Sequence, residues 1–233
     1  MIVVIGNGSS RSVFNLNLLD NHISYGCNAV YRVYKPTYLI SGDHHMIWDN
    51  CYSGYSKEYN CFFKSFDKIP YYNYEMIKSM YPSGFRILET TPKTKEFVSF
   101  QINKTDLSIY WVSEEEKSEK IEWWGENEND SYTSGTAAMK LACIMNPKED
   151  IYCIGFDYYL DRTADNIFLG TRHYRYASNI EEAHQYFNSK KGTQFDRENW
   201  IKQHKRIEEE YDNRIYHVGK HLNYIEFEEL LNK

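Results

Sequence analysis

The sequence predicts an α/β fold, with a Rossmann-like, mostly parallel sheet, flanking helices and a small lid subdomain. Residues 2–5 form a β-branched run without alternation, which is typical of a strand buried on both faces. A glycine-rich turn follows at once and leads into an apolar stripe with helical spacing. Further along, a nearly all-apolar helix that ends at Asn146-Pro147 precedes a second buried strand at 151–155. Strand and helix therefore alternate as they do in α/β folds.

The other elements follow from the same patterns. The stripe after the first turn predicts a helix at 13–20. Strands are expected at 23–28, 37–40, 97–102, 108–112 and 214–218. Further helices are expected at 46–55, 180–187, 198–211 and 222–231. The length suits one large domain or one domain plus a subdomain, and we expect a single domain, 1–233, with the polar loop 161–177 as its lid. The polar, acidic stretch 113–130 predicts an exposed connection and is a second candidate for the lid.

The composition argues against several classes of protein. A net charge of −6 argues against a broad basic surface that coats nucleic acid. No apolar run reaches the roughly 20 residues that span a bilayer, so neither an integral membrane segment nor a signal peptide is expected. Five cysteines without a C-x-x-C pair suit neither a zinc site nor a full disulfide framework. These features favour a cytoplasmic protein, and the Asn-, Lys- and Tyr-rich composition suggests a bacterial or phage-infected cell.

The first candidate site is the turn formed by Gly6, Asn7, Gly8 and Ser9, between a buried strand and a helix N-terminus. Small residues and free amides at this position of α/β folds receive phosphate or ribose oxygens. A full dinucleotide fingerprint would have glycine where Arg11 stands. On spacing alone, a nucleotide contact and a plain tight turn both remain open.

Two further features point to the same kind of ligand. Ser134 and Gly135 lie at the N-terminus of the second helix, whose amides and dipole favour an anion, with an ordinary N-cap as the alternative. Asp157 follows the second buried strand, where it would bind a ribose or sugar hydroxyl or simply end the strand.

A third group combines phosphate binding with proton transfer. Phenols and guanidinium groups donate hydrogen bonds to phosphate, and a neutral imidazole can accept a proton. A solvated basic loop is the alternative explanation. The group comprises Tyr158, Tyr159, Arg172, His173 and Arg175. Asp43, which precedes two histidines, is only a weak candidate for a metal ligand, and no metal is otherwise expected.

Four motifs occur in order along the chain: Val-Ile-Gly-Asn-Gly-Ser-Ser at 4–10, Gly-Cys-Asn at 26–28, Thr-Ser-Gly at 133–135 and Ile-Tyr-Cys-Ile-Gly-Phe-Asp-Tyr-Tyr at 151–159. Together they resemble the bacterial CMP-sialic-acid-dependent sialyltransferases, which are small glycosyltransferases with a Rossmann-like domain and a lid. The resemblance implies a nucleotide-activated sugar donor, in first place a CMP-sugar, and a glycan or other hydroxyl acceptor. It implies no required cofactor or metal.

Position by position, the resemblance implies a role for each matching residue in donor binding or catalysis. The nucleotide phosphate and ribose would lie beside Asn7, Gly8 and Asn28, the donor beside Ser134 and Gly135, and the ribose beside Asp157. Tyr159 would donate a hydrogen bond to the leaving phosphate.

The chain departs from the family in three places. The family's second phosphate-binding tyrosine has no obvious equivalent between Leu160 and Leu169. Ser9 stands where family members usually have proline. The family's base is a histidine in a His-Tyr-x-x-His sequence, whereas here His173-Tyr174 is followed by Ala177 at the second histidine position. His173 is therefore a substitute candidate for the base.

Three functional hypotheses follow. The leading one is a glycosyltransferase in which His173 and Tyr159 are catalytic. The second is a pyrophosphokinase-like enzyme, similar to the archaeal pterin pyrophosphokinases, that would hold Mg²⁺ with Asp43 and Asp157. The third is a non-catalytic, phage-encoded binding or scaffold protein. A homo-oligomer is compatible with all three.

Overall fold

The structure is a computed structural model of the 233-residue chain. It describes residues 1–43, 46–47, 49–50, 53–64, 85–90, 97–102, 105–110, 121–124, 132–160, 166–171, 174, 181–182, 185, 189 and 197–232.

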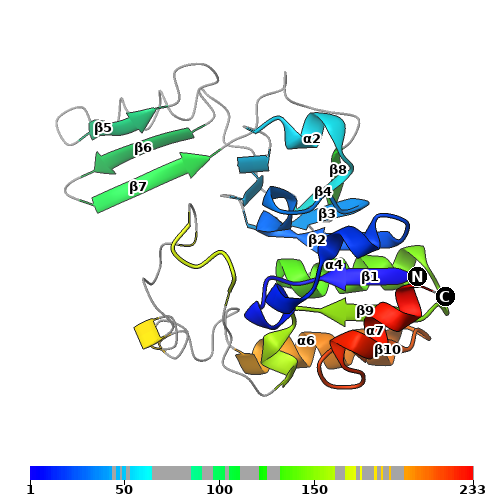
Figure 1. Cartoon of the computed structure of the whole chain (residues 1–233). Coiled ribbons are helices and arrows are strands. Elements are labelled where there is room, and N and C mark those ends of the chain that lie inside the picture. The colour runs from blue at the N-terminus through cyan, green and yellow to red at the C-terminus, as the bar shows by residue number, and fades with distance from the viewer. Residues whose placement is uncertain are drawn as a thin grey trace.

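A seven-stranded sheet in which every neighbouring pair is parallel forms the centre of the molecule (Figure 1). The strand order is β10-β9-β1-β2-β3-β4-β8. The strands are β1 (Ile2–Ile5), β2 (Ile23–Cys27), β3 (Tyr38–Ser41), β4 (Cys61–Lys64), β8 (Ile121–Trp124), β9 (Ile151–Ile154) and β10 (Ile215–His217). The predicted Rossmann-like α/β class is confirmed.

β1 is covered on both faces, which explains why its apolar residues do not alternate with polar ones. Ile2 and Val4 belong to a core that includes helix α4 (Ser134–Met145). Val3 and Ile5 pack on the opposite face in a core that includes Phe227 of helix α7 (Tyr224–Leu231). Each buried aliphatic side chain of this kind stabilises the fold by about 1.5–3 kcal/mol.

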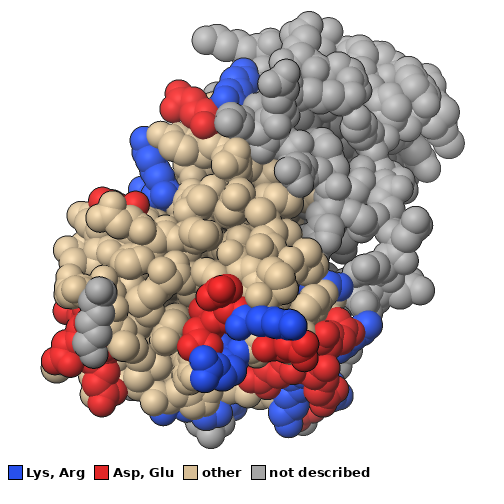
Figure 2. Space-filling view, turned by 90° about the vertical axis from the view of Figure 1, so that its right-hand side faces the viewer, with Lys and Arg blue, Asp and Glu red and all other residues tan. Residues whose placement is uncertain are grey.

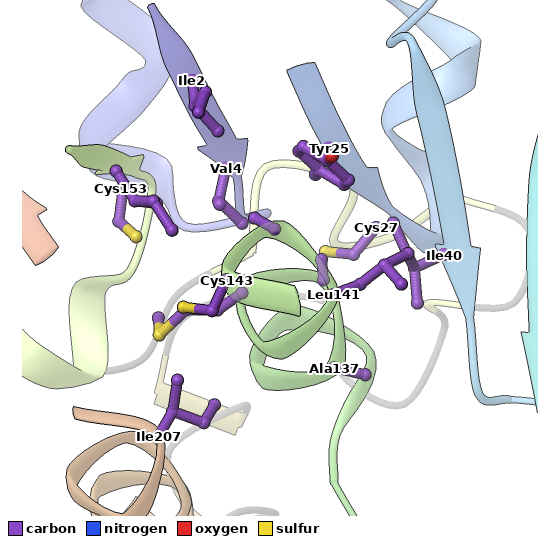
Figure 3. Close-up of a cluster of buried hydrophobic side chains, with 14 of the residues drawn as sticks. Ile2, Val4, Tyr25, Cys27, Ile40, Ala137, Leu141, Cys143, Cys153 and Ile207 are labelled. Atoms are coloured by element: carbon purple, nitrogen blue, oxygen red, sulfur yellow. The ribbon is translucent and has the colours of Figure 1, made fainter. Parts of the chain in front are cut away.

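Helix α4 is itself enclosed between the sheet and a second helix, α6 (Arg197–Glu210). Figure 3 shows Leu141 and Cys143 of α4 among the strand residues, with Ile207 of α6 nearby. This sandwich explains why the predicted helix before Asn146-Pro147 is apolar on nearly all sides. Four cysteines, Cys27, Cys61, Cys143 and Cys153, are buried and free.

The prediction of one continuous helix at 13–20 is wrong. The segment forms two short 3-10 helices, η1 (Ser9–Val13) and η2 (Leu16–Leu19), separated by extended backbone at Phe14 and Asn15. The Asn15 side chain accepts a hydrogen bond from the amide of Asn17 and so caps η2, which favours a new turn over a continuous helix. A third 3-10 helix, η3 (Asn28–Arg32), follows β2.

The middle of the chain also differs from the prediction. Strand β8 lies within the expected connection 113–130 and pairs with β4 in the large sheet. A separate antiparallel sheet contains β5 (Phe85–Thr90), β6 (Phe97–Ile102) and β7 (Thr105–Tyr110). The strand predicted at 97–102 is confirmed, the one predicted at 108–112 lies earlier, and β5 was not predicted. A four-residue helix, α2 (Tyr55–Glu58), precedes β4.

No helix in the described part of the chain has both the length and the apolar character needed to cross a membrane.

Candidate functional site

A cleft opens where the order of the parallel strands reverses. From β1 the chain passes to β2, β3 and β4 on one side, whereas β9 and β10 lie on the other side of β1. Ligands of open α/β sheets bind outside the carboxyl ends of the strands at such a switch point. The empty space of the cleft, together with the open solvent at its mouth, is about 600 Å³. The cleft is lined by Gly6, Asn7, Gly8, Cys27, Thr133, Gly135, Gly155, Phe156, Asp157, Tyr158, Asn166 and Trp200.

The turns after β1 and β9 are in direct contact at the base of this cleft. The amide of Gly8 donates to the carbonyl of Gly155 at 2.9 Å. A Cβ atom on Gly6 would lie 2.4 Å from the Gly155 carbonyl oxygen, and one on Gly8 would lie 2.3 Å from Oδ1 of Asp157. These two glycines are therefore required by the close approach of the two turns, whatever the ligand.

Asp157 joins the same two turns through its side chain. It is 3% exposed, and its carboxylate accepts hydrogen bonds from the amide of Ser10 at 3.1 Å and from the hydroxyl of Ser9 at 3.2 Å. The hydroxyl of Ser10 also donates to this carboxylate. Asp157 lines the cleft as predicted, and the structure adds a role in holding the glycine-rich turn in place.

The N-terminus of α4 forms another part of the cleft wall. Thr133, its N-cap, and Gly135 line the cleft, and the first amides of any helix have no partner within that helix. Ser134 is not a lining residue: its Oγ accepts a hydrogen bond from the amide of Gly42 at 2.9 Å, which ties α4 to the end of β3.

Two asparagines place amide oxygens near the turn. Asn7 lines the cleft, and its Nδ2 donates to the carbonyl of Cys27 at 3.4 Å. Asn28 has a positive φ of 49° and lies directly after the cleft residue Cys27. The Oδ1 atoms of both asparagines are buried and have no hydrogen-bond partner among the described residues. Such atoms are commonly satisfied by a ligand or by water.

An aromatic wall faces the two turns. Phe156 and Tyr158 follow β9, and Trp200 comes from α6. The rings of Tyr158 and Trp200 are 5.5 Å apart in an edge-on arrangement. The Tyr158 hydroxyl is buried and has no partner among the described residues. Burial raises the pKa of Tyr158 well above its ordinary value, so this phenol keeps its proton and remains a hydrogen-bond donor.

Tyr159, the other predicted phosphate donor, is not among the residues that line the cleft. Its ring stacks on His217 with centroids 4.2 Å apart and lies 4.4 Å from the ring of His204. The Nζ atom of Lys220 lies 4.2 Å from the Tyr159 ring centroid. The phenol in the cleft is therefore Tyr158, and Tyr159 covers a histidine cluster behind it.

That cluster is the most unusual polar feature of the core. His204 and His217 are fully buried, and their Nε2 atoms are 3.0 Å apart. Nε2 of His204 also lies 3.2 Å from Oε1 of Glu208, and this contact lowers the pKa of Glu208. Burial lowers the pKa of His217 to about 2, so this imidazole is neutral at ordinary pH.

A buried guanidinium group lies behind the glycine-rich turn. Arg11, at the position where the dinucleotide fingerprint has glycine, is 3% exposed, and its Nε donates to the carbonyl of Gly6 at 2.7 Å. It also lies 5.9 Å from the ring centroid of Phe168. Arg11 thus supports the turn from inside the protein and does not line the cleft.

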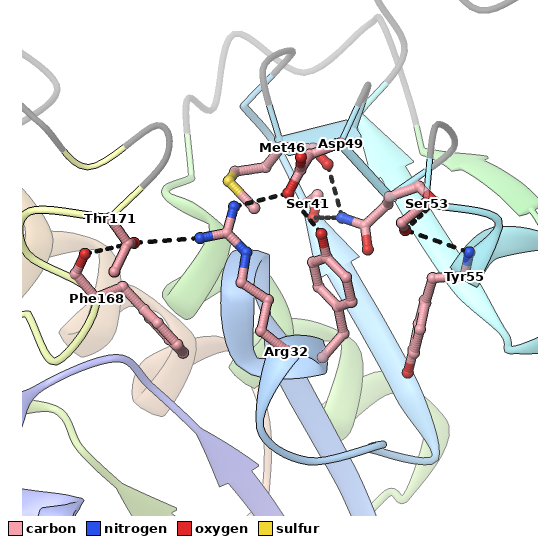
Figure 4. A network of polar contacts seen from close by, with 10 residues as sticks. Arg32, Ser41, Met46, Asp49, Ser53, Tyr55, Phe168 and Thr171 are labelled. Carbon is pink, nitrogen blue, oxygen red and sulfur yellow. Dashed lines mark hydrogen bonds and ion pairs between the residues drawn. The ribbon is translucent and has the colours of Figure 1, made fainter.

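Part of the predicted lid is anchored beside the cleft. Asn166 lines the cleft, and the next amide, that of Ile167, donates to the carbonyl of Asn7 at 3.0 Å. Figure 4 shows Arg32 between Thr171 and Asp49, with hydrogen bonds of 3.2 Å and 2.7 Å respectively. The segment 166–171 is therefore tied both to the first turn and to η3.

The remaining predicted residues divide into two groups. Arg172, His173, Arg175 and Ala177 lie outside the described residues. Asp43 is exposed. The described part of the chain contains no group of three or more His, Cys, Asp or Glu side chains that could hold a metal ion. Cys27 lines the cleft, but burial raises its pKa to about 12, so its thiol stays protonated.

Sequence reasoning missed the contribution of α6. Trp200, Gln203, His204 and Ile207 have the spacing of one helix face, and the last three are buried. Gln203 and His204 are therefore polar residues at positions where a core residue is expected. This mismatch is the signal from which the contribution of α6 could have been predicted.

On the face seen in Figure 2, the acidic and basic side chains of the described residues are interspersed along the lower edge.

Comparison of the chain with protein-family models, curated proteins and solved structures gives no significant match. The resemblance to the sialyltransferases accordingly stays a prediction from the four motifs.

Proposed function

We propose that this protein is a glycosyltransferase that binds a nucleotide-activated sugar, in first place a CMP-sugar, and transfers the sugar to an acceptor hydroxyl. The observation that carries the proposal is the cleft at the switch point between β1 and β9. Three features meet there: the glycine-rich turn, the N-terminus of α4 and the buried phenol of Tyr158.

Each wall of the cleft suits a different part of such a donor. The first-turn amides of α4 and its dipole favour the phosphate. The oxygens of Asn7 and Asn28, which lack protein partners among the described residues, suit hydroxyl or amino donors of a ribose or base. The rings of Phe156 and Trp200 offer apolar faces for a base or a sugar.

The proposed reaction is a direct displacement. The acceptor oxygen attacks the anomeric carbon, the bond from that carbon to the phosphate oxygen breaks, and the acceptor proton passes to a base. Tyr158 would donate a hydrogen bond to the departing phosphate, where negative charge develops. The base is His173, assigned from sequence.

The first experiment is a binding screen on the full chain with CMP, UDP, GDP, ADP and the corresponding sugar nucleotides. Thermal shift and titration calorimetry would follow binding, since a ligand that prefers the folded state raises the melting temperature. We expect CMP and CMP-sugars to stabilise the protein most. Stabilisation by none of these nucleotides would contradict the proposal and favour a non-catalytic binding protein.

The second experiment measures CMP release from CMP-N-acetylneuraminic acid, with and without EDTA. We expect turnover that survives excess EDTA and that falls in His173→Ala while CMP still binds. Turnover that requires Mg²⁺ and a nucleoside triphosphate, with none from the CMP-sugar, would instead support the pyrophosphokinase-like alternative.

A further inference from the structure

We infer that Gln203 of α6 is a positioning residue for ligand binding: it holds the start of α4 through the amide of Thr133 and the hydroxyl of Thr136, and it does not use the amide of Gly135, which a phosphate would meet. The inference rests on the proposed function. It concerns a residue that contributes to the cleft only through α4, since Gln203 is not among the lining residues.

The start of α4 lacks the usual cap. Thr133 occupies the N-cap position, yet its side chain makes no capping hydrogen bond. Its hydroxyl lies 3.0 Å from the hydroxyl of Thr136 instead. A Ser, Thr or Asp cap normally uses its side-chain oxygen to satisfy an amide of the first turn, and losing such a cap costs about 1 kcal/mol.

Gln203 supplies an acceptor for a different donor, the amide of the N-cap residue itself. Its Oε1 accepts from the amide of Thr133 at 2.9 Å and from the hydroxyl of Thr136 at 2.5 Å. Both Gln203 and Thr136 are buried, with 9% and 0% exposure. One oxygen atom therefore holds two residues of the first turn, the N-cap Thr133 and the third helical residue Thr136.

This arrangement has a consequence for the cleft. Because the acceptor comes from α6 and bonds at Thr133 and Thr136, it does not use the amide of Gly135, a residue that lines the cleft. A neutral amide oxygen is also compatible with an anion beside it, whereas an Asp or Glu cap would repel a phosphate.

A second feature links Gln203 to the ligand. Trp200 lies three residues earlier on the same face of α6 and lines the cleft. Helix α6 thus contributes one ring of the aromatic wall, Trp200, and also holds the N-terminus of α4. A change at Gln203 is expected to act on the phosphate, and a change at Trp200 on the base or sugar.

The test distinguishes the effect of adding a negative charge at position 203 from the effect of removing the hydrogen-bond acceptor there. Gln203→Glu keeps an acceptor at the same place but adds one negative charge, which the N-terminus of α4 favours and burial disfavours, so we expect the variant to fold with a melting temperature near that of the wild type. Affinity for CMP should fall roughly tenfold, because a carboxylate a few ångströms from a phosphate repels it in a partly buried site. Affinity for cytidine, which has no phosphate, should stay within about twofold, since no charge is added to that ligand.

Two other variants complete the design. Gln203→Met removes the acceptor, and we expect the melting temperature to fall by roughly 2–4 °C and the affinity for CMP to fall more than that for cytidine. Lys205→Gln, at an exposed position of α6, changes the net charge by the same amount as Gln203→Glu and should leave CMP affinity unchanged. If Gln203→Glu does not fold, the role of Gln203 is tested by comparing the loss of affinity for CMP with the loss of affinity for cytidine in Gln203→Met.

Each outcome has a defined meaning. A wild-type protein that binds neither CMP nor cytidine overturns both the proposed function and this inference. A wild-type protein that binds CMP, together with variants that lose CMP and cytidine equally or bind both as the wild type does, leaves the proposed function standing and overturns the role of Gln203.

Discussion

The rings of Tyr158 and Tyr159 are perpendicular, with an interplanar angle of 89° and 6.4 Å between their centroids. Both residues belong to the 3-10 helix η5 (Asp157–Leu160), in which successive side chains point about 120° apart. One ring therefore lines the cleft and the other covers His217.

This geometry predicts which phenol acts on the leaving group. Tyr158→Phe should lower kcat for CMP-sugar turnover about 10²-fold, because it removes a hydrogen-bond donor from the cleft. Tyr159→Phe keeps the ring that stacks on His217 and should change kcat much less. Steady-state kinetics on both variants makes the comparison. The reverse order of effects would support the assignment of Tyr159 that the family resemblance implies.

Gly8→Ala should destabilise the fold by about 1–3 kcal/mol, the usual cost of overpacking. The new Cβ would lie 2.3 Å from the Asp157 carboxylate and 2.7 Å from the Gly155 carbonyl oxygen, and the latter belongs to the backbone. Urea denaturation measures the loss. Gly135→Ala is the matched control, because its Cβ would lie 3.4 Å from its nearest neighbour, a Phe156 ring atom. Equal stability of the two variants would contradict the proposed contact between the turns.

Asp157→Asn should lower the free energy of unfolding by about 1–3 kcal/mol even without a ligand, because the new amide group faces donors from Ser9 and Ser10. A double-mutant cycle with Ser10→Ala measures the coupling between Asp157 and Ser10. We expect a coupling energy clearly different from zero. A loss of nucleotide affinity with no loss of stability would show that Asp157 serves the ligand alone.

The histidine cluster predicts a loss of stability in acid. The unfolded chain binds a proton on His217 near pH 6.5, whereas the folded chain resists protonation down to about pH 2. Between these values the unfolded state holds more protons, so stability falls as the pH falls, by up to about 1.4 kcal/mol per pH unit from this group. The lowered pKa of Glu208 acts in the same direction below its ordinary value of 4.5. Besides burial, the groups that lower the pKa of His217 are His204, His221 and Lys220.

Denaturant unfolding between pH 8 and pH 5 tests this prediction. His217→Asn, which does not titrate, should show a shallower dependence of stability on pH than the wild type. His22→Asn is the control, since His22 lies near the surface next to the N-terminus and should alter the slope less. A wild-type slope that survives in His217→Asn would assign the effect to other groups.

The parts of the site that depend on local sequence were predictable. The turn from Gly6 to Gly8 and the start of α4 follow from short-range patterns, and both line the cleft. Trp200 and Gln203 reach the site only because α6 packs on α4, which no local pattern specifies. The same holds for β8, whose strand structure depends on pairing with β4, although its sequence neighbourhood is polar and acidic.

Local sequence also could not predict which of the two adjacent tyrosines, Tyr158 or Tyr159, lines the cleft. Adjacent residues carry the same chemistry, and only the backbone conformation after β9 determines which one enters the cleft. The continuous helix predicted at 13–20 failed for a similar reason, because the side chain of Asn15 bonds to its own neighbourhood and starts a separate turn.

The strand order has a consequence for how the protein is made. β1 is made before the other strands of its sheet, but one of its two neighbours, β9, begins only at Ile151. Until then the backbone groups along that edge of β1 have no strand partner, and the turn at Gly8 lacks the carbonyl of Gly155. The two halves of the cleft therefore meet only after β9 has been made, and a nascent chain that stops before β9 should be unable to bind the ligand and should be prone to aggregate through the exposed edge.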